Sequence, residues 1–310
     1  MTGRAATSAG NARTTPDPRG FVCGEVRTSV LRTSEALIGR TAAQLLDLRP
    51  DERVRLSQRP NLQVLSPPLL TGVDCPLPTA SGARTRAVGT VRTRAVLTEG
   101  RVLQSSAFTH VRPGDGDRRQ PWGHYLIRPG VVEPLGRHTS RDAADGFLAA
   151  APLPAGVLNP GAVAERLLDR VLRHPLLDQR APFKSGRTRL RWAALPADDG
   201  QGPSIERFTV ADDGLRTVIV RTPRPDPETL AALCEDLALH DWLLTTLIAL
   251  VERARLGAGD GPAVLTALRP AVDHLLHLWM PGARIHGDLA VVWATLEREP
   301  GFSRQWQTLV

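Results

Sequence analysis

The chain has 310 residues, of which 42% are hydrophobic, so it can bury a full core, and the usual domain size of roughly 100–200 residues indicates two domains. Its 39 Lys and Arg residues exceed its 32 Asp and Glu residues by 7, a balance that permits anionic partners without identifying one. Cys23, Cys75 and Cys234 are too few and too far apart for a disulfide framework or a Cys-x-x-Cys metal site. We therefore expect reduced thiols in a cytoplasmic protein.

The first 19 residues contain arginines but no apolar run of seven or more residues, so they do not read as a signal peptide, and we expect a disordered leader. Residues 20–222 lie in a basic region, because the first 222 residues hold 32 Arg and Lys against 21 Asp and Glu, a net of +11. Short apolar runs separated by Gly, Pro and Asp predict that this region is a largely antiparallel β domain with a few helices.

Alternating apolar residues predict a first strand and then two hairpins in this domain. The first strand is Phe21–Arg32. Arg84–Leu97 and Val102–Val111 flank a short polar turn, and so do Glu206–Val210 and Leu215–Val220, which predicts a β-hairpin in each case. The long first arm of the first hairpin leads us to expect a bend or bulge at its glycine, Gly89.

The positions of proline and glycine and the spacing of apolar residues predict the other elements of this domain. In chain order they predict a helix at Thr41–Leu48, an extended loop at Pro60–Pro78, short strands at Tyr125–Ile127 and Val131–Pro134, a helix from Asn159 to Pro175, and a strand at Arg187–Leu195.

From Pro223 onward the sequence is acidic and helical, with 7 Arg against 11 Asp and Glu. Asp226 is a suitable N-cap, Pro227 suits the first helical position and Glu228 lies in the first turn, so we predict a helix that runs to about Arg255. Three shorter helices follow, which predicts a compact helical bundle over residues 226–310 and an α+β protein overall. The shorter helices are expected from Asp260 to before Pro281, at Asp288–Glu297 and at Phe302–Leu309.

The most apolar stretch of the chain, Leu237–Val251, has 15 residues and includes His240 and Asp241. A bilayer requires about 20 apolar residues, so we expect no membrane association. We interpret His240 and Asp241 as a hydrogen-bonded polar pair within the core of the bundle.

The motif Arg-Thr-Arg occurs three times and supplies the candidate anion-binding residues. Residues two apart share a face of a strand, so the arginines would line one sheet face if the strands were neighbours. Such a face could follow a phosphate backbone or bind an acidic protein, and the alternative is the solvated side of a half-exposed sheet. The candidates are Arg84, Arg86, Arg92, Arg94, Arg187, Arg189 and Arg191.

Histidines concentrate in the predicted bundle, where His274 and His277 have a helical spacing that allows a shared metal, with His240 as a third candidate. Neither His-Glu-x-x-His nor Glu-x-x-His is present, so a metal-dependent hydrolase is the weaker alternative. The segment His286–Leu289 resembles the catalytic loop of aminoglycoside-phosphotransferase-type kinases over four residues, but a phosphate loop and a strand lysine are lacking. We therefore interpret Asp288 as a helix cap and predict neither a catalytic residue nor a cofactor.

Four segments are similar to a family of streptomycete and related actinobacterial proteins to which no activity is assigned, and the likeness extends over most of the chain. The segments are Leu70–Ser81, Leu233–Thr246, Val272–Ala283 and Pro300–Trp306. The family is encoded beside a variant P-loop protein resembling partition ATPases and beside a methyltransferase-like protein. The resemblance implies membership of a multi-protein system and supplies no catalytic residue.

Taken together, these features predict a cytoplasmic, non-enzymatic adaptor with a protein partner or a homo-oligomeric state. A binder of nucleic acid or another anionic polymer through the arginine strands is the first alternative, and a metal-dependent hydrolase is the second.

Overall fold

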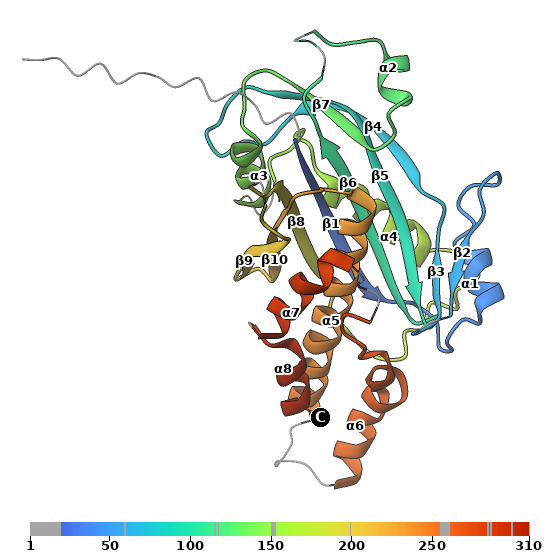
Figure 1. The fold of residues 1–310 in the computed structure, drawn as a ribbon. Coiled ribbons are helices and arrows are strands. Elements are labelled where there is room, and N and C mark those ends of the chain that lie inside the picture. The colour runs from blue at the N-terminus through green and yellow to red at the C-terminus, as the bar shows by residue number, and fades with distance from the viewer. Residues whose placement is uncertain are drawn as a thin grey trace, which may run out of the picture.

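The computed structural model describes residues 20–58, 60–114, 116, 118–149, 153–198, 200–254, 261–283, 285, 287–298 and 300–309. The predicted leader, residues 1–19, lies outside the described residues. Mixed sheet and helices make the protein α+β, as the sequence predicts (Figure 1).

Ten strands form one mixed sheet in the order β2-β3-β5-β7-β6-β1-β8-β10-β9, with β4 also beside β5. Most neighbours are antiparallel, whereas β8–β10 and β6–β7 are parallel. The strands are β1 (Phe21–Val30), β2 (Arg55–Ser57), β3 (Gln63–Leu65), β4 (Leu69–Pro76), β5 (Arg86–Thr98), β6 (Val102–Val111), β7 (Val131–Leu135), β8 (Thr188–Pro196), β9 (Ser204–Val210) and β10 (Leu215–Thr222).

The 13-residue strand β5 organises one half of this sheet because each of its edges pairs with two other strands. One edge pairs with β4 and then with β3, and the other pairs with β7 and then with β6. The change from β7 to β6 occurs after Gly89, whose φ of 150° suits glycine. A Cβ at Gly89 would lie 2.2 Å from the Val131 carbonyl oxygen, so the close approach of β7 also requires glycine there.

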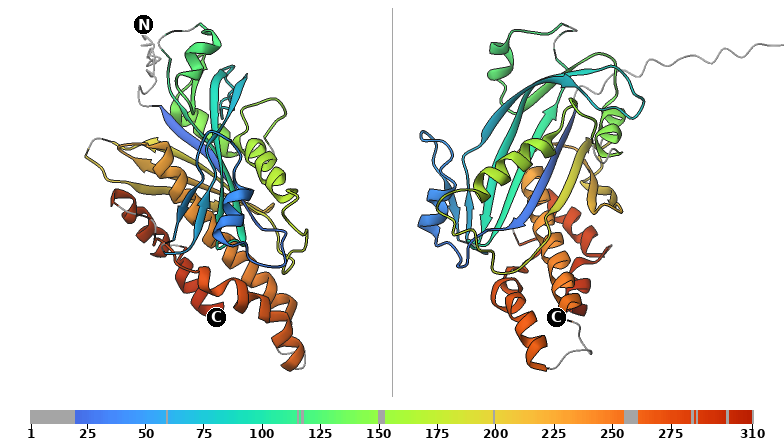
Figure 2. Two further views of the ribbon diagram at one scale, coloured as in Figure 1. Left: turned by 90° about the vertical axis from the view of Figure 1, so that its right-hand side faces the viewer. Right: turned by 180° about the vertical axis from the view of Figure 1, so that it is seen from behind.

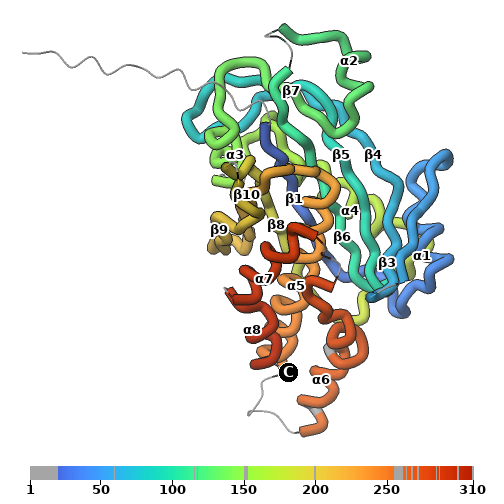
Figure 3. The backbone as a smooth tube through the Cα atoms, viewed as in Figure 1, coloured from blue at the N-terminus to red at the C-terminus, as the bar shows by residue number. Residues whose placement is uncertain are grey.

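Helices cover both faces of the sheet. On one face lie α3 (Ser140–Ala149) and α4 (Pro160–Leu172), with α1 (Gly39–Leu45) toward the β2–β3 end (Figure 2). On the other face α5 (Pro227–Ala254) packs across β1, β6 and β8, and β10 leads directly into it (Figure 3). The short helix α2 (Trp122–Leu126) packs against β5.

The C-terminal helices share their core with the sheet. α6 (Gly261–His274) and α8 (Phe302–Leu309) contact α5, whereas α7 (Ala290–Arg298) contacts α8 and β9. Two 3-10 turns, η1 (Leu276–Leu278) and η2 (Gly287–Leu289), lie between α6 and α7. Trp242, Trp293 and Trp306 belong to the same buried apolar cluster as Val22 and Trp192 of the sheet. The helical layer is therefore built on the strands.

Local signals predict most elements correctly, including both hairpins and the long helix α5. Two predictions are wrong. Tyr125–Ile127, expected as a strand, lies mainly in helix α2, where burial of Tyr125 fixes one turn too short to show a helical period. The loop expected at Pro60–Pro78 contains β3 and β4, because an edge strand tolerates the flanking prolines that a central strand would exclude.

Candidate binding site

The predicted arginine candidates do not share one face. Strands β5 and β8 are separated in the sheet by β6 and β1, with β7 beside the other end of β5. Arg94 of β5 lies on the α5 face, where it contacts Glu235, whereas Arg191 of β8 lies on the opposite face, where it contacts Glu25 and Phe147. The condition for a continuous arginine face, that these strands are neighbours, is therefore not met.

Arg92 and Arg94 bind carboxylates of α5. Arg94 donates from Nε and Nη2 to the two carboxylate oxygens of Glu235, both at 2.8 Å, and from Nη1 to Glu228 Oε2 at 2.7 Å. Arg92 also contacts Glu228 and donates to the carbonyl oxygen of Pro129 at 3.1 Å. These guanidiniums attach the long helix to the sheet.

The other arginine candidates have similar partners. Arg191 donates from Nε to Glu25 Oε2 at 2.9 Å and from Nη1 to the Phe147 carbonyl oxygen at 3.0 Å. Arg86 pairs with Asp74, Arg187 with Glu165 and Asp169, and Arg189 with Asp213, whereas Arg84 lies at an exposed pocket between β4 and β5. Anion binding by these seven residues stays a prediction.

His240 and Asp241 are both buried, but the hydrogen bonds found link them to different residues. His240 Nδ1 donates to the Asp236 carbonyl oxygen at 2.7 Å, and Nε2 accepts from the Met280 N–H at 3.3 Å. Asp241 pairs with Arg216 at 2.9 Å. Adjacent helical residues project about 100° apart, so each side chain finds its own partner. Burial raises the pKa of Asp241, and Arg216 offsets part of this effect.

The weak metal candidates have separate surroundings. The His240 ring lies edge-on to Trp279 and Trp293, and the hydrogen bonds to both of its nitrogens leave no free lone pair for a cation. His274 stacks on Phe183, and burial followed by the charge of Arg101 lowers the pKa of His274. His277 is exposed in η1. Among the described residues, no three His, Cys, Asp or Glu side chains come together as metal ligands would. Arg284 and His286 of the kinase-like segment lie outside the described residues.

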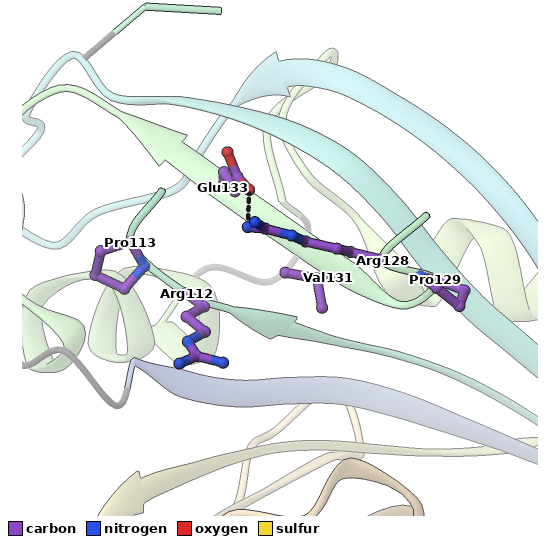
Figure 4. Close-up of a pocket in the computed structure, with 6 residues that line it drawn as sticks. All are labelled: Arg112, Pro113, Arg128, Pro129, Val131 and Glu133. Carbon is purple, nitrogen blue, oxygen red and sulfur yellow. Dashed lines mark hydrogen bonds and ion pairs between the residues drawn. The ribbon is translucent and has the colours of Figure 1, made fainter. Parts of the chain in front are cut away.

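A pocket of about 360 Å³ lies where β6 ends and β7 begins (Figure 4). Its lining residues come from the end of β6, from β7 and from the turn that precedes β7. They include two arginines and one buried glutamate: Arg112, Pro113, Arg128, Pro129, Val131 and Glu133. Charged and apolar groups together in a concave surface are typical of a binding site.

Hydrogen bonds between threonine hydroxyls and the backbone fix the turn that carries Arg128. Gly130 has a φ of 81°, which favours glycine, and its N–H donates to Thr90 Oγ1 at 2.7 Å. Thr109 Oγ1 donates to the carbonyl oxygens of Thr90 and Gly130, both at 3.1 Å. The pocket therefore rests on two strands, β5 and β6, that are rigidly paired with each other.

Glu133 holds one side of the pocket in place. This buried carboxylate accepts from Arg128 Nη1 at 3.0 Å and contacts His124 Nε2 at 2.8 Å. A Cβ at Gly114 would lie 2.5 Å from Glu133 Oε2, so the backbone after β6 passes directly over the carboxylate. Arg112 differs because it is exposed and has no ion pair with any residue that the structure describes. Its guanidinium remains available to an external anion.

The helix α2 beside this pocket presents apolar side chains outward. Trp122, Leu126 and Ile127 are 39%, 58% and 76% exposed. The helix is anchored by Tyr125, which is buried and accepts from the Gln120 N–H at 2.9 Å. Arg119 lies over the Trp122 ring, 5.5 Å from its centroid. Three large apolar groups on so short a helix form an exposed patch with basic neighbours.

Sequence reasoning missed this site because no local motif marks it. Arg112 and Arg128 are brought together by the parallel contact of β6 with β7, which pairs Val111 with Val132. The one local signal is the apolar pair Leu126–Ile127 next to a turn, and that pattern predicts a strand.

Comparison with known proteins adds no relative: the chain matches no family model, no curated protein and no solved structure. No helix within the described ranges has the length and apolar character needed to span a membrane.

Proposed function

We propose that this protein is a cytoplasmic, non-enzymatic adaptor of a multi-protein bacterial system, and that it binds an acidic segment of a partner protein. The contact is made by Arg112, Arg128, Trp122, Leu126 and Ile127, here called the α2 surface. The observation that carries this proposal is Arg112, which has no ion pair with a described residue, at a pocket whose other arginine, Arg128, directly follows the exposed Leu126 and Ile127 in the chain.

The chemistry of the α2 surface favours a partner with both a carboxylate and apolar side chains. A guanidinium binds a carboxylate through two parallel hydrogen bonds, and among the described residues nothing competes with such a ligand for Arg112. Glu133 and His124 hold Arg128 in an extended position across the pocket. Arg128 therefore needs little ordering when a ligand arrives, which lowers the entropic cost of binding.

The apolar half of the α2 surface supplies the area that a charge contact lacks. Solvent-exposed ion pairs contribute little by themselves, about 0–1 kcal/mol. Burial of apolar area contributes about 25 cal/mol per Å², so covering Leu126 and Ile127 would exclude water from the arginines and strengthen the pairing. A partner that matches only the charge, such as a nucleic acid backbone, would leave these side chains exposed.

We also propose that α5 to α8 act as the helical bundle that the sequence predicts, with the sheet as one of its walls. The charge and the apolar pattern of residues 226–310 support this division of the chain. The bundle then serves to brace the sheet face from which the α2 surface extends.

A purification experiment with matched variants tests the adaptor proposal. Tagged full-length chain is recovered from native cells at physiological salt as wild type, Arg112→Glu and Ile127→Asp, and co-purifying proteins are quantified by mass spectrometry. Arg269→Glu on α6 and Leu176→Asp just after α4 are the controls, because both residues are exposed and α2 packs mainly against β5. We expect one protein that both α2 variants lose and both controls retain.

The identity of that protein decides the outcome. The proposal is supported if the purified partner binds this protein directly and if neutralising one of its acidic segments abolishes binding. The neutralising changes replace Asp by Asn and Glu by Gln. Equal recovery by all variants would overturn the proposal. Recovery of the chain itself, with the same variant dependence, would replace the acidic partner by a second copy.

A further inference from the structure

One edge of strand β4 is open. In the described part of the chain β4 pairs with a single strand, β5, and none of its residues is fully buried. Toward the C-terminal end of β5, the same edge of β5 pairs with β3, and β3 in turn pairs with β2. β2 therefore occupies the next row of the sheet beside β3, whereas the corresponding row beside β4 holds no described strand (Figures 1 and 2).

The hydrogen-bonding phase of β4 shows which backbone groups face this row. The Leu77 N–H donates to the Thr85 carbonyl oxygen, so the backbone N–H and C=O groups of Leu77 point toward β5. Antiparallel strands alternate between inward and outward groups with a period of two, which turns the N–H and C=O groups of Leu70, Gly72 and Asp74 outward. The Pro76 carbonyl also points outward, since it accepts from the Leu158 N–H at 2.8 Å and not from β5. The edge is thus occupied at Pro76, and the Asp74 carbonyl oxygen accepts from Arg86 Nη2 at 3.4 Å. The open carbonyl groups of the edge are those of Gly72 and Leu70.

A groove of about 200 Å³ lies on one side of this edge, between β4, β5 and α4. Its apolar lining includes Leu69, Val163 and Leu167, and its two cations are Arg166 and Arg170. Both arginines are exposed, and neither has an ion pair with a described residue; Arg166 donates only to the Ala162 carbonyl oxygen. The side chains of Leu69 and Thr71 point to this groove, so a strand beside them would point alternate side chains the same way.

We propose that the open edge of β4 binds an extended segment of a partner protein as an added strand. The segment alternates aliphatic and acidic residues, so that its acidic side chains reach Arg166 and Arg170 while its backbone pairs with Leu70, Gly72 and the Asp74 N–H. Main-chain hydrogen bonds supply affinity in this mode and side-chain pockets supply specificity. The segment completes the row of the sheet that β2 begins.

Charge decides between this occupant and a second copy of the chain. Antiparallel pairing of two β4 edges about a two-fold axis would place both grooves on the same face, with four arginines near the axis. Like charges at that spacing oppose association, whereas an acidic segment neutralises them. The edge adjoins the α2 surface at Trp122, which lies 3.4 Å from the Cβ position of Gly72. This contact is on the face opposite Thr71, and therefore on the face opposite the groove with Arg166 and Arg170.

The binding test uses dye-labelled nine-residue peptides and the full-length chain, read by fluorescence anisotropy. The probes are alternating Val-Glu, alternating Val-Lys, and the Val-Glu peptide methylated on alternate backbone amides. We expect the Val-Glu peptide to bind at least tenfold more tightly than the other two. Because the methylated probe is tested on the unaltered chain, this comparison does not depend on the folding of any variant.

Two sets of variants locate the contact. Leu70→Pro removes an outward N–H and leaves the β4–β5 ladder intact, so binding should fall about tenfold while the melting temperature stays close to that of the wild type. Val210→Pro is the matched control, because the bond from the Ala211 N–H to the Leu215 carbonyl oxygen turns the Val210 N–H outward on the edge strand β9. Arg166→Glu with Arg170→Glu should reverse the preference toward the Val-Lys peptide.

Equal binding of the Val-Glu and methylated peptides would overturn the proposal, and so would an absence of binding at millimolar peptide. A concentration-dependent dimer that Leu70→Pro dissolves would replace the acidic segment by a second copy. These results are independent of the adaptor proposal, since Arg112→Glu and Ile127→Asp should leave peptide binding unchanged.

Discussion

The two faces of the sheet bury charge in different ways. On the α4 face, Glu25, Arg27 and Arg191 form a cluster whose three members all belong to strands. On the α5 face, Arg92 and Arg94 of β5 bind Glu228 and Glu235 of the helix. The first cluster cross-links β1 to β8, whereas the second determines where α5 lies on the sheet. The arginines of β5 and β8 therefore have a structural role in this protein. The position of the carboxylate that each arginine binds determines whether it links two strands or links a helix to the sheet.

The two clusters also differ in their access to water. Glu25 is fully buried, and a Cβ at Gly161 would lie 2.4 Å from its carboxylate, so the first turn of α4 rests directly on it. That arrangement suits a helix N-terminus, where negative charge is favourable. On the α5 face, Glu235 is buried but the side chain of Glu228 is 43% exposed. The α4-face cluster should consequently be the more sensitive to deletion.

Arg191→Ala should give the largest loss of stability. It removes the more buried of the two arginines that pair with Glu25 and leaves Arg27 as the other. A buried ion that loses its partner costs roughly 3–5 kcal/mol, so we expect a loss near the lower end of that range. The free energy of unfolding in urea measures the loss. Replacing Arg191 and Glu25 together by Met and Leu should restore much of it, and a double variant less stable than Arg191→Ala would contradict this account.

Glu235→Ala should have the second largest effect. The Glu235 carboxylate accepts two hydrogen bonds from Arg94 and contacts Ser106. A hydrogen bond to a charged group contributes about 1.5–3 kcal/mol to stability. Glu228→Gln is the control, and its exposure should limit the loss to about 1 kcal/mol. Urea unfolding of both variants tests the order, which would be wrong if Glu228→Gln were the more damaging.

Asp241 should produce a smaller, pH-dependent effect on the same helix. Because burial raises the pKa of Asp241 in the folded protein, its contribution to stability is fully present below the unfolded-state pKa and is lost as pH rises through the folded-state pKa. The stability of wild type relative to Asp241→Asn should therefore decrease as pH rises above the ordinary range of an aspartate. Unfolding midpoints of both proteins across the acidic range check the sign, and a rising difference would show that Arg216 outweighs burial.

Arg187→Gln should have the smallest effect of this series. Arg187 binds Glu165 and Asp169 of α4, but all three side chains are about one third exposed. Exposed ion pairs of this kind contribute about 0.2–1 kcal/mol and are screened by salt. The difference in melting temperature from wild type should shrink further in 1 M NaCl. A salt-independent loss would place Arg187 with the buried clusters.

The elements that could be predicted from the sequence are those with local signals. Asp226 caps α5 as expected, accepting from the Thr229 N–H at 2.8 Å, and both hairpins have a polar turn between alternating strands. Helix α2 and strand β4 lack such signals, because one depends on the burial of Tyr125 and the other on its position at an edge.

The candidate sites could not be predicted because they depend on strand order. The arginines at 92 and 94 meet carboxylates more than 130 residues away, and Arg112 meets Arg128 only after β7 has joined β6. No spacing along the chain encodes that β1 separates β6 from β8. Polar patterning therefore identifies which residues need partners, and topology alone assigns them.

The central position of β1 also determines when the fold can close during translation. β1 precedes every other strand of the sheet along the chain. One of its edges can pair only after β6 has been synthesised, and the other only after β8, which ends at Pro196. The face of β1 that packs against α5 is covered later still, because that helix begins at Pro227. Such non-local pairing folds slowly and leaves apolar strand surface open to aggregation in the meantime. A nascent chain of this protein thus keeps one face of β1 uncovered until the ribosome has delivered α5.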